Sequence, residues 1–129
     1  MRRIVVGVDG SSAAAAALSL ACDEAVLHDA QLSVVHVRER EFAWADAQSV
    51  LDMAVNECRD RAMRTVTGAL ASGPAWSALA EASRYANLVC VGSRGRSGFK
   101  TAVFGSVALR VAEHADCAVA ITHPRATGH

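Results

Sequence analysis

The residues best suited to chemistry in this chain form a glycine-rich, basic stretch. An apolar run at residues 89–91 leads into Gly92-Ser93-Arg94-Gly95-Arg96-Ser97-Gly98, and a Gly105-Ser106 pair follows. Glycines allow positive φ and let a ligand approach the backbone without a Cβ in the way. A helix that starts at Gly105-Ser106 would offer free N–H groups to an anion, and Arg94 and Arg96 add phosphate-compatible charge. The stretch therefore predicts a phosphate-binding loop.

The spacing of this stretch excludes two common nucleotide-binding motifs. A P-loop needs G-x-x-x-x-G-K-[ST], but Phe99 stands where the second glycine must precede Lys100-Thr101. A dinucleotide-binding G-x-G-x-x-G should follow the first strand, where the chain has Gly7-Val8-Asp9-Gly10 instead. The predicted phosphate site is of neither kind.

Length and composition indicate one globular domain over residues 1–129. Hydrophobic residues make up 52% of the chain and charged residues 20%, which is typical of a chain that buries a core. A formal net charge of +0 disfavours nucleic acid or an anionic membrane as a partner. The apolar run after Met1-Arg2-Arg3 is too short for a secretory signal, and no stretch approaches the ~20 apolar residues of a membrane span. We therefore expect a soluble, cytoplasmic protein.

The cysteines and histidines do not indicate a metal site. Cys22, Cys58, Cys90 and Cys117 are scattered without a C-x-x-C pair, and three of them stand among apolar residues. This is typical of reduced, buried thiols in a cytosolic protein. Without paired ligand spacing we expect no zinc site. His36 lies in a valine-rich run, and we interpret it as structural rather than catalytic.

Apolar runs bounded by turn residues predict five strands. Runs such as Ile4–Val8 are rich in β-branched residues and too short for helices, so they read as strands buried on both faces. Residues 65–71 give the weakest pattern, because Gly68 and several alanines interrupt it. The predicted strands span residues 4–8, 31–37, 65–71, 87–91 and 117–122.

Four helices are predicted between these strands. Apolar residues recur at helical spacing in each intervening segment. Ser11 or Ser12 can cap the first helix, and Pro74 suits the first position of the third. The predicted helices span residues 12–28, 46–65, 74–85 and 103–114.

The alternation of strands and helices predicts a parallel sheet with right-handed crossovers. We expect an α/β fold with an open, doubly wound five-stranded sheet of flavodoxin-like order 3-2-1-4-5 and helices on both faces. Such sheets bind ligands beyond the carboxyl ends of their strands, where the strand order reverses. Asp9 and the loop after Gly92 both leave the sheet at that point, between strands one and four.

The spacing Gly92-x2-Gly95-x9-Gly105-Ser106 resembles the ATP-binding motif G-x2-G-x9-G-[ST] of the universal stress protein family. Residues 5–11 and 115–121 also resemble that family, and the likeness covers most of the chain. The chain departs from the family pattern at Gly7, where many members have proline, and at Asn87, where many have aspartate. The resemblance implies an ATP-binding protein of the stress response.

The resemblance also implies which residues hold the nucleotide. One carboxylate would bind the ribose, residues of the first two strands would line the base, and the glycine loop and the following helix start would bind the phosphates, with Mg²⁺ bridging them. The implied set is Asp9 for the ribose, Gly7, Val8 and Val37 for the adenine, and Gly92, Arg94, Gly95, Arg96, Gly105, Ser106 and Val107 for the phosphates.

Simpler interpretations of these residues are open. Asp9 could cap the first helix or accept a hydrogen bond from a loop amide. Ser106 could be an ordinary helix residue, and Arg94 and Arg96 could be solvated charges. The sequence alone does not decide between these roles and ligand contact.

Three functions are consistent with the sequence. The first is a nucleotide-dependent switch or sensor. The second is a slow ATPase or an autophosphorylating protein, with Ser97 or Ser106 as the acceptor. The third is a nucleotide-free dimerising scaffold, which the intact glycine set disfavours. No G-x-S-x-G motif or local nucleophile–base pair is present, so an efficient hydrolase is not expected and enzymatic activity is an open question.

The last predicted strand suggests how the protein associates with itself. Residues Cys117–Thr122 would form an apolar strand at the edge of the sheet with open backbone groups. Family members pair this strand with its symmetry mate, and the resemblance implies an isologous homodimer here.

Overall fold

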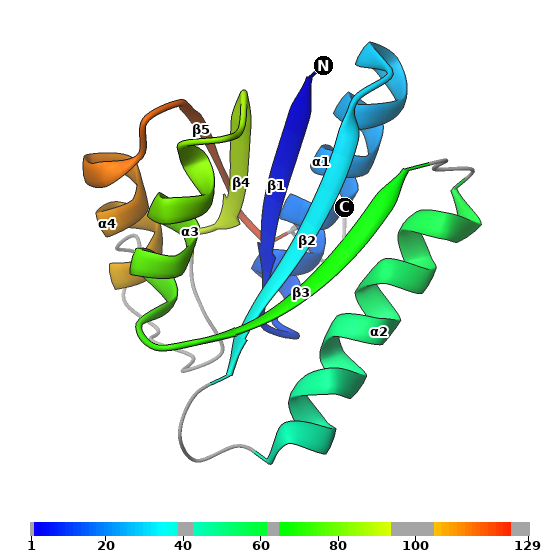
Figure 1. The fold of residues 1–129 in the computed structure, drawn as a ribbon, viewed down its shortest axis with the longest axis horizontal. Coiled ribbons are helices and arrows are strands. Elements are labelled where there is room, and N and C mark those ends of the chain that lie inside the picture. The colour runs from blue at the N-terminus through cyan, green and yellow to red at the C-terminus, as the bar shows by residue number, and fades with distance from the viewer. Residues whose placement is uncertain (1, 39–42, 62–64, 94–104, 125–129) are drawn as a thin grey trace.

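The computed structural model describes residues 2–38, 43–61, 65–93 and 105–124. Strands and helices alternate strictly along these residues (Figure 1). The elements are β1 (Arg3–Val8), α1 (Ser12–His28), β2 (Gln31–Arg38), α2 (Trp44–Asp60), β3 (Val66–Ser72), α3 (Ala75–Ser83), β4 (Leu88–Gly92), α4 (Ser106–His114) and β5 (Ala118–Thr122).

These strands form one parallel sheet in the order β3-β2-β1-β4-β5, which confirms the predicted topology. β1 lies at the centre, paired with β2 on one side and β4 on the other. Helices α1 and α2 pack on one face, and α3 and α4 pack on the other (Figure 1). The carboxyl ends of the strands point to the lower edge of the view in Figure 1. The candidate site residues are therefore expected at that edge.

Alternation along the strands divides the core into two layers. Val6 and Val34 belong to the cluster under α1 and α2, whereas Val5 and Val35 belong to the cluster under α3 and α4. Both faces of the central strands are thus buried. This explains why their sequences are continuous apolar runs and do not alternate between apolar and polar residues.

The strand β3 confirms the weakest of the strand predictions and explains the glycine that weakened it. β3 pairs with β2 from Val66 to Ser72. A Cβ on Gly68 would lie 2.9 Å from Val55 Cγ2 of α2, so the missing side chain lets the helix pack closely on the sheet. Gly68 therefore indicates a close approach of two elements, a property that strand propensity does not record.

Five helix boundaries differ from those predicted, among them the start of α2 at Trp44 instead of residue 46 and the end of α3 at Ser83 instead of residue 85. Helix α2 begins at Trp44 and ends at Asp60, not at residue 65, because the Thr65 carbonyl already accepts a hydrogen bond from the Leu32 N–H of the sheet. Pro74 is the N-cap of α3 and lies outside the helix. Helix α4 begins at Ser106, not at residue 103, with Gly105 as its N-cap.

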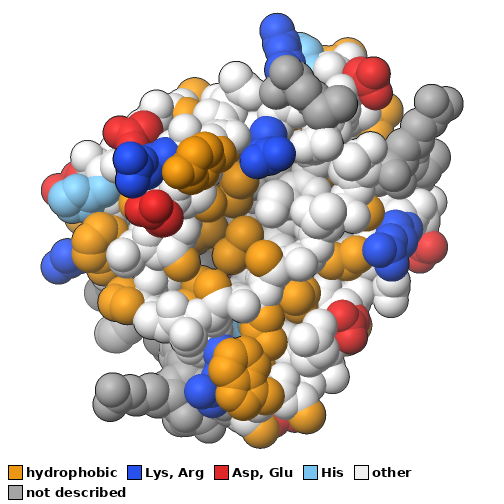
Figure 2. All heavy atoms as spheres, viewed as in Figure 1, with side chains coloured by type: hydrophobic (Ala, Val, Ile, Leu, Met, Phe, Trp, Pro, Cys, Tyr) orange, Lys and Arg blue, Asp and Glu red, His pale blue; other side chains and the backbone are white. Residues whose placement is uncertain are grey.

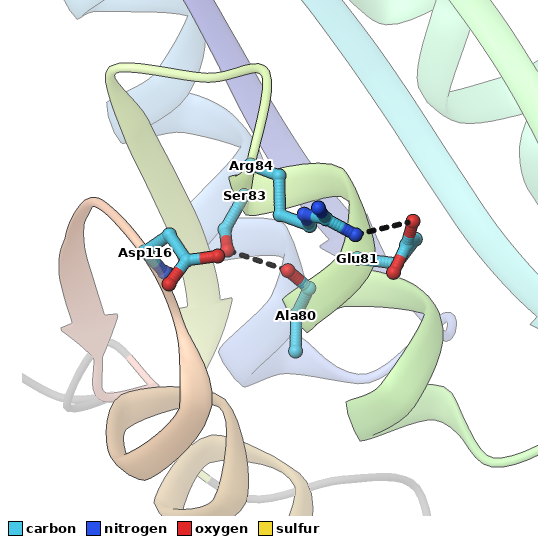
Figure 3. Close-up of polar contacts among 5 residues, drawn as sticks. All are labelled: Ala80, Glu81, Ser83, Arg84 and Asp116. Atoms are coloured by element: carbon cyan, nitrogen blue, oxygen red, sulfur yellow. Dashed lines mark hydrogen bonds and ion pairs between the residues drawn. The ribbon is translucent and has the colours of Figure 1, made fainter.

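A buried serine ties the amino edge of the sheet together (Figure 3). The Ser83 hydroxyl donates to the Ala80 carbonyl and accepts from the Asp116 N–H at 2.9 Å, so it joins the end of α3 to the turn between α4 and β5. Ser83 is 1% exposed, so these bonds exclude water. The nearby Arg84–Glu81 ion pair is exposed and contributes little to stability.

The surface carries charges of both signs. Figure 2 shows hydrophobic side chains gathered on one face, with positive and negative groups interspersed around its rim. This distribution agrees with the formal net charge of +0. Within the described ranges, the helices are too short or too polar to cross a lipid bilayer.

We predict that Ser83→Ala lowers the free energy of unfolding by about 1–2 kcal/mol, because it leaves the Asp116 N–H without its acceptor. Urea denaturation measures the change. Ser77→Ala, at an exposed position of the same helix, is the matched control and should change stability by less than about 0.5 kcal/mol. Equal, small effects of the two substitutions would contradict the role of Ser83.

Candidate functional site

The two strands that carry the predicted site residues part at the carboxyl edge of the sheet. The β1–β4 pairing ends at Val6–Cys90, while β1 goes on to pair with β2 through Val8 and β4 with β5 through Gly92. The strand order reverses here, which is the position where doubly wound sheets bind ligands. Continuing the β1–β4 register would set Asp9 opposite Ser93.

Asp9 forms the turn that leads from β1 into α1. Its carboxylate accepts a hydrogen bond from the Ser11 N–H at 2.9 Å, and the Ser11 hydroxyl accepts from the Ala14 N–H at 3.2 Å as the N-cap of α1. Asp9 thus accepts a hydrogen bond from a loop amide, which was one of the roles that the sequence left open for it. A carboxylate has two oxygens and can accept several hydrogen bonds.

Gly92 allows the first turn of α1 to lie directly against the end of β4. A Cβ on Gly92 would lie 2.7 Å from the Ala13 carbonyl carbon and 2.8 Å from the Ala14 nitrogen. The Thr122 hydroxyl of β5 donates to the Ala13 carbonyl at 3.0 Å and fixes the same turn. This corner therefore has no space for any side chain at position 92.

The sequence suggested that the glycines of this stretch allow a positive φ. That interpretation is wrong at Gly92 and Gly105. Among the described glycines, only Gly10 and Gly73 have positive φ. Gly105 has a φ of −59°, a value that any residue adopts. At Gly92 the constraint is steric contact with α1, which depends on the packing of two distant segments.

The start of α4 presents backbone donors that no side chain of the described residues caps. Gly105 is the N-cap, has no side chain to offer, and donates its own N–H to the Ser93 carbonyl. No acidic residue lies in the first turn. The N–H groups of Ser106 and Val107 are therefore at the positive end of a nine-residue helix without an internal acceptor.

Ser93 is a site residue that sequence reasoning did not assign. Its side chain is 2% exposed, and its Oγ has no hydrogen-bond partner among the residues that the structure describes. Its N–H donates to the Thr122 carbonyl at 2.6 Å, which continues the ladder of β4. Side chains two residues apart in a strand lie on the same face, so the Ser93 side chain lies on the same face as Val91, under α3 and α4. Buried hydroxyls are rarely unpaired, so this one indicates a missing partner.

The residues implied for the adenine lie on different faces of the sheet. Val37 belongs to the cluster under α3 and α4, and Leu79 of that cluster covers Gly7, whose Cβ would lie 2.8 Å from Leu79 Cδ1. Val8 belongs to the opposite cluster, so its side chain lies on the other face of the sheet from Val37 and Leu79. Contact of Val8 with a base would have to come from its main chain.

His36 has the structural role that the sequence suggested. It is 6% exposed, and its Nδ1 lies 2.6 Å from the Val8 carbonyl oxygen. Because a carbonyl only accepts, Nδ1 must carry the proton. His36 thus fixes the end of β1, one residue before Asp9, to β2.

Part of the predicted set lies outside the described residues. Arg94, Gly95 and Arg96 are in this group, and so are Ser97 to Phe104. Over the described portion of the chain, no three histidine, cysteine or acidic side chains come together as metal ligands.

Comparison with known proteins relates this arrangement to one family. The model of the universal stress protein family matches residues 1–123. A universal stress protein of Mycobacterium tuberculosis is 34% identical over 131 residues, covering 94% of this chain and 48% of that protein. One of Mycolicibacterium smegmatis is 31% identical over 141 residues, covering 95% of this chain and 46% of that protein. The chain thus spans about half the length of these relatives.

Solved structures give the same relation. A universal stress protein in complex with cAMP is similar with a TM-score of 0.81 and 26% identity, covering 96% of this chain and 98% of that one. The universal stress protein of Archaeoglobus fulgidus is similar with a TM-score of 0.79 and 26% identity, covering 95% and 93%. The same organism's protein in complex with dAMP, at 24% identity and a TM-score of 0.78, shares the fold.

We predict that Gly92→Ala destabilises the protein by roughly 2–3 kcal/mol, because its methyl group meets the backbone of α1, which cannot move without displacing the Asp9 turn. Gly7→Ala is the matched control. Its methyl group meets only the flexible end of Leu79, so about 1 kcal/mol or less is expected. Chemical denaturation compares the two, and a smaller loss for Gly92→Ala than for Gly7→Ala would contradict this packing.

Proposed function

Because the chain belongs to the universal stress protein family, we propose that it is an ATP-binding member that acts as a nucleotide-dependent switch or sensor in a stress response. The supporting observation is the pair of unused donors at the carboxyl edge of the sheet. The uncapped N–H groups at the start of α4 and the buried, unpartnered hydroxyl of Ser93 are joined by the hydrogen bond from Gly105 to Ser93.

The described residues fit an anionic nucleotide. The amides of Ser106 and Val107 would bind a phosphate at the positive end of α4, and the Ser93 hydroxyl would donate to the same group. Asp9 would accept a hydrogen bond from a ribose hydroxyl, since a carboxylate can accept several. Gly92 would bring its backbone close to the phosphates, and Gly95, Arg94 and Arg96 would complete the loop. A protein with the same fold and 26% identity was solved with cAMP, which supports an adenine nucleotide as the ligand.

A magnesium ion would accompany the nucleotide. Mg²⁺ is usually held by one or two carboxylates and by substrate phosphate oxygens. Since the described residues contain no cluster of metal ligands, the phosphates would supply most of the oxygens. Slow hydrolysis or autophosphorylation is the alternative function, and phosphate release during incubation with ATP distinguishes it from a switch.

The first test of this function is calorimetry with ATP and Mg²⁺. We predict saturable binding to the wild-type protein at or below millimolar ATP, which is the cellular range in which a sensor must respond. Absence of binding at that concentration would exclude both the switch and the ATPase.

Substitution of Ser93 tests whether ATP binds at the carboxyl edge of the sheet. Ser93→Ala should weaken ATP binding roughly 10- to 150-fold, the effect of one hydrogen bond to a charged group, without lowering stability, because the hydroxyl has no partner in the described protein to lose. Ser83→Ala is the converse control: it should lower stability and leave affinity unchanged, since Ser83 lies at the opposite edge. Unchanged affinity in Ser93→Ala would remove Ser93 from the site.

We also propose that two copies of the chain pair through β5. The Thr122 carbonyl accepts a hydrogen bond from the Ser93 N–H, so the backbone groups of Thr122 point toward β4. Because backbone groups alternate in direction along a strand, the N–H and carbonyl groups of Val119 and Ile121 point to the open edge of β5. Ala118–Thr122 is a short, largely apolar strand, which is suited to antiparallel pairing with a second copy.

Sedimentation tests the dimer. The wild-type protein should sediment as a dimer, and Val119→Pro should sediment as a monomer, because proline removes an outward N–H while sparing the β4–β5 ladder. A monomeric wild-type protein, or an unchanged dimer in Val119→Pro, would contradict pairing through β5.

A further inference from the structure

Two cysteines from different helices meet in the core on the face opposite α3 and α4. Cys22 of α1 is 1% exposed and Cys58 of α2 is 0% exposed. Their Sγ atoms lie 2.6 Å apart, and both thiols are free. They are separated by 36 residues of chain, so their contact is a product of the tertiary fold. The sequence, which has no closely spaced cysteine pair, gives no sign of it.

The pair is placed for covalent bonding. Disulfide formation joins two sulfurs at ~2.05 Å, so the Cys22 and Cys58 sulfurs would have to approach by only about half an ångström. The surrounding side chains are apolar and belong to the cluster under α1 and α2. Cys90 lies in the same cluster, whereas Cys117 precedes β5 on the other side of the sheet.

We propose that Cys22 and Cys58 form a redox modification site, in which hydrogen peroxide converts the two thiols into a reversible disulfide between α1 and α2. This inference does not depend on nucleotide binding. Cytosolic disulfides of this kind are usually transient and redox-sensing.

The reaction has two balanced steps. The Cys22 thiolate attacks one oxygen of hydrogen peroxide, the O–O bond breaks, and the departing hydroxide takes up a proton to leave as water, so that Cys22 becomes a sulfenic acid. The Cys58 sulfur then attacks the Cys22 sulfur, the S–O bond breaks, and a second water leaves with the Cys58 proton. Overall, two thiols and one peroxide give one disulfide and two waters. An external dithiol reverses the change by exchange.

The electrostatics of the pair assign the two roles. The hydrogen bond with the Cys58 thiol lowers the pKa of Cys22, burial opposes this effect, and the charge of Arg61, the C-cap residue of α2, lowers the pKa further. The same hydrogen bond and burial raise the pKa of Cys58. Cys22 is therefore the sulfur that reaches the thiolate form first, and Cys58 is the resolving thiol. Desolvation raises the pKa of Cys90 to about 12, which disfavours it as a competing nucleophile.

The burial of the Cys22 and Cys58 sulfurs determines the size of the oxidant that can reach them. Neither sulfur is open to solvent, so a bulky aromatic disulfide reagent should modify Cys22 and Cys58 in the native protein far more slowly than half-buried Cys117. Peroxide is little larger than water and can enter through small, local separations of α1 from α2. A disulfide would then restrict those separations.

Peptide mapping of the reduced, full-length wild-type protein tests the proposal. After peroxide treatment, the protein is denatured, alkylated and digested with trypsin without reductant. Cleavage after Arg38, Arg59, Arg84 and Arg110 puts each cysteine on a different peptide. We expect the peptides of Cys22 and Cys58 to be joined with the loss of two hydrogen atoms, and dithiothreitol to separate them. The oxidised protein should melt roughly 5–15 °C higher, because the bond closes a long loop.

Variants identify the residues. Cys58→Ser should abolish the joined peptides and leave Cys22 to oxidise to the sulfinic acid, while Cys117→Ser should form the bond like the wild type. If Cys58→Ser does not fold, the wild-type map decides alone. Free Cys22 and Cys58 after treatment that oxidises Cys117, or joined peptides that contain Cys90 or Cys117, would overturn the proposal.

Discussion

The contact between the first turn of α1 and the end of β4 is the constraint on which the candidate site depends. Gly92 lies against the backbone of Ala13 and Ala14 with no space for a Cβ, and the Thr122 hydroxyl holds the Ala13 carbonyl from β5. Because α1 begins directly after the Asp9 turn, this contact also fixes Asp9 relative to β4. Three segments far apart in the sequence thus form one corner with little freedom to move.

The two faces of the sheet carry different groups of residues. The face under α3 and α4 carries Val37, Gly7 and the start of α4, whose first N–H groups no described side chain caps. The face under α1 and α2 is apolar and encloses the Cys22–Cys58 pair. Hydrophobic burial stabilises both layers, while the exposed ion pairs contribute little. The specific polar bonds, at Ser83 on the amino edge and at Asp9 and His36 on the carboxyl edge, determine how the ends of the strands are held.

The sequence was sufficient to predict the fold because the fold follows from periodicity. Short β-branched runs alternating with helical patterns predicted the strand order that the structure has, and the first helix was predicted with its observed limits, Ser12–His28. Contacts between distant segments could not be predicted in this way. The packing of α1 on Gly92, the unpaired hydroxyl of Ser93 and the meeting of Cys22 with Cys58 depend on the folded arrangement. Local patterns also placed the end of α2 too late, because pairing of Thr65 with β2 overrides helix propensity.

A crystal structure with a non-hydrolysable ATP analogue and Mg²⁺ tests the central claim most directly. The account predicts nucleotide density at the carboxyl edge, with phosphate oxygens within hydrogen-bond distance of the Ser106 and Val107 amides and the Ser93 hydroxyl, and the ribose beside Asp9. Density for the analogue elsewhere on the protein, or none at this edge at a saturating concentration, would contradict it.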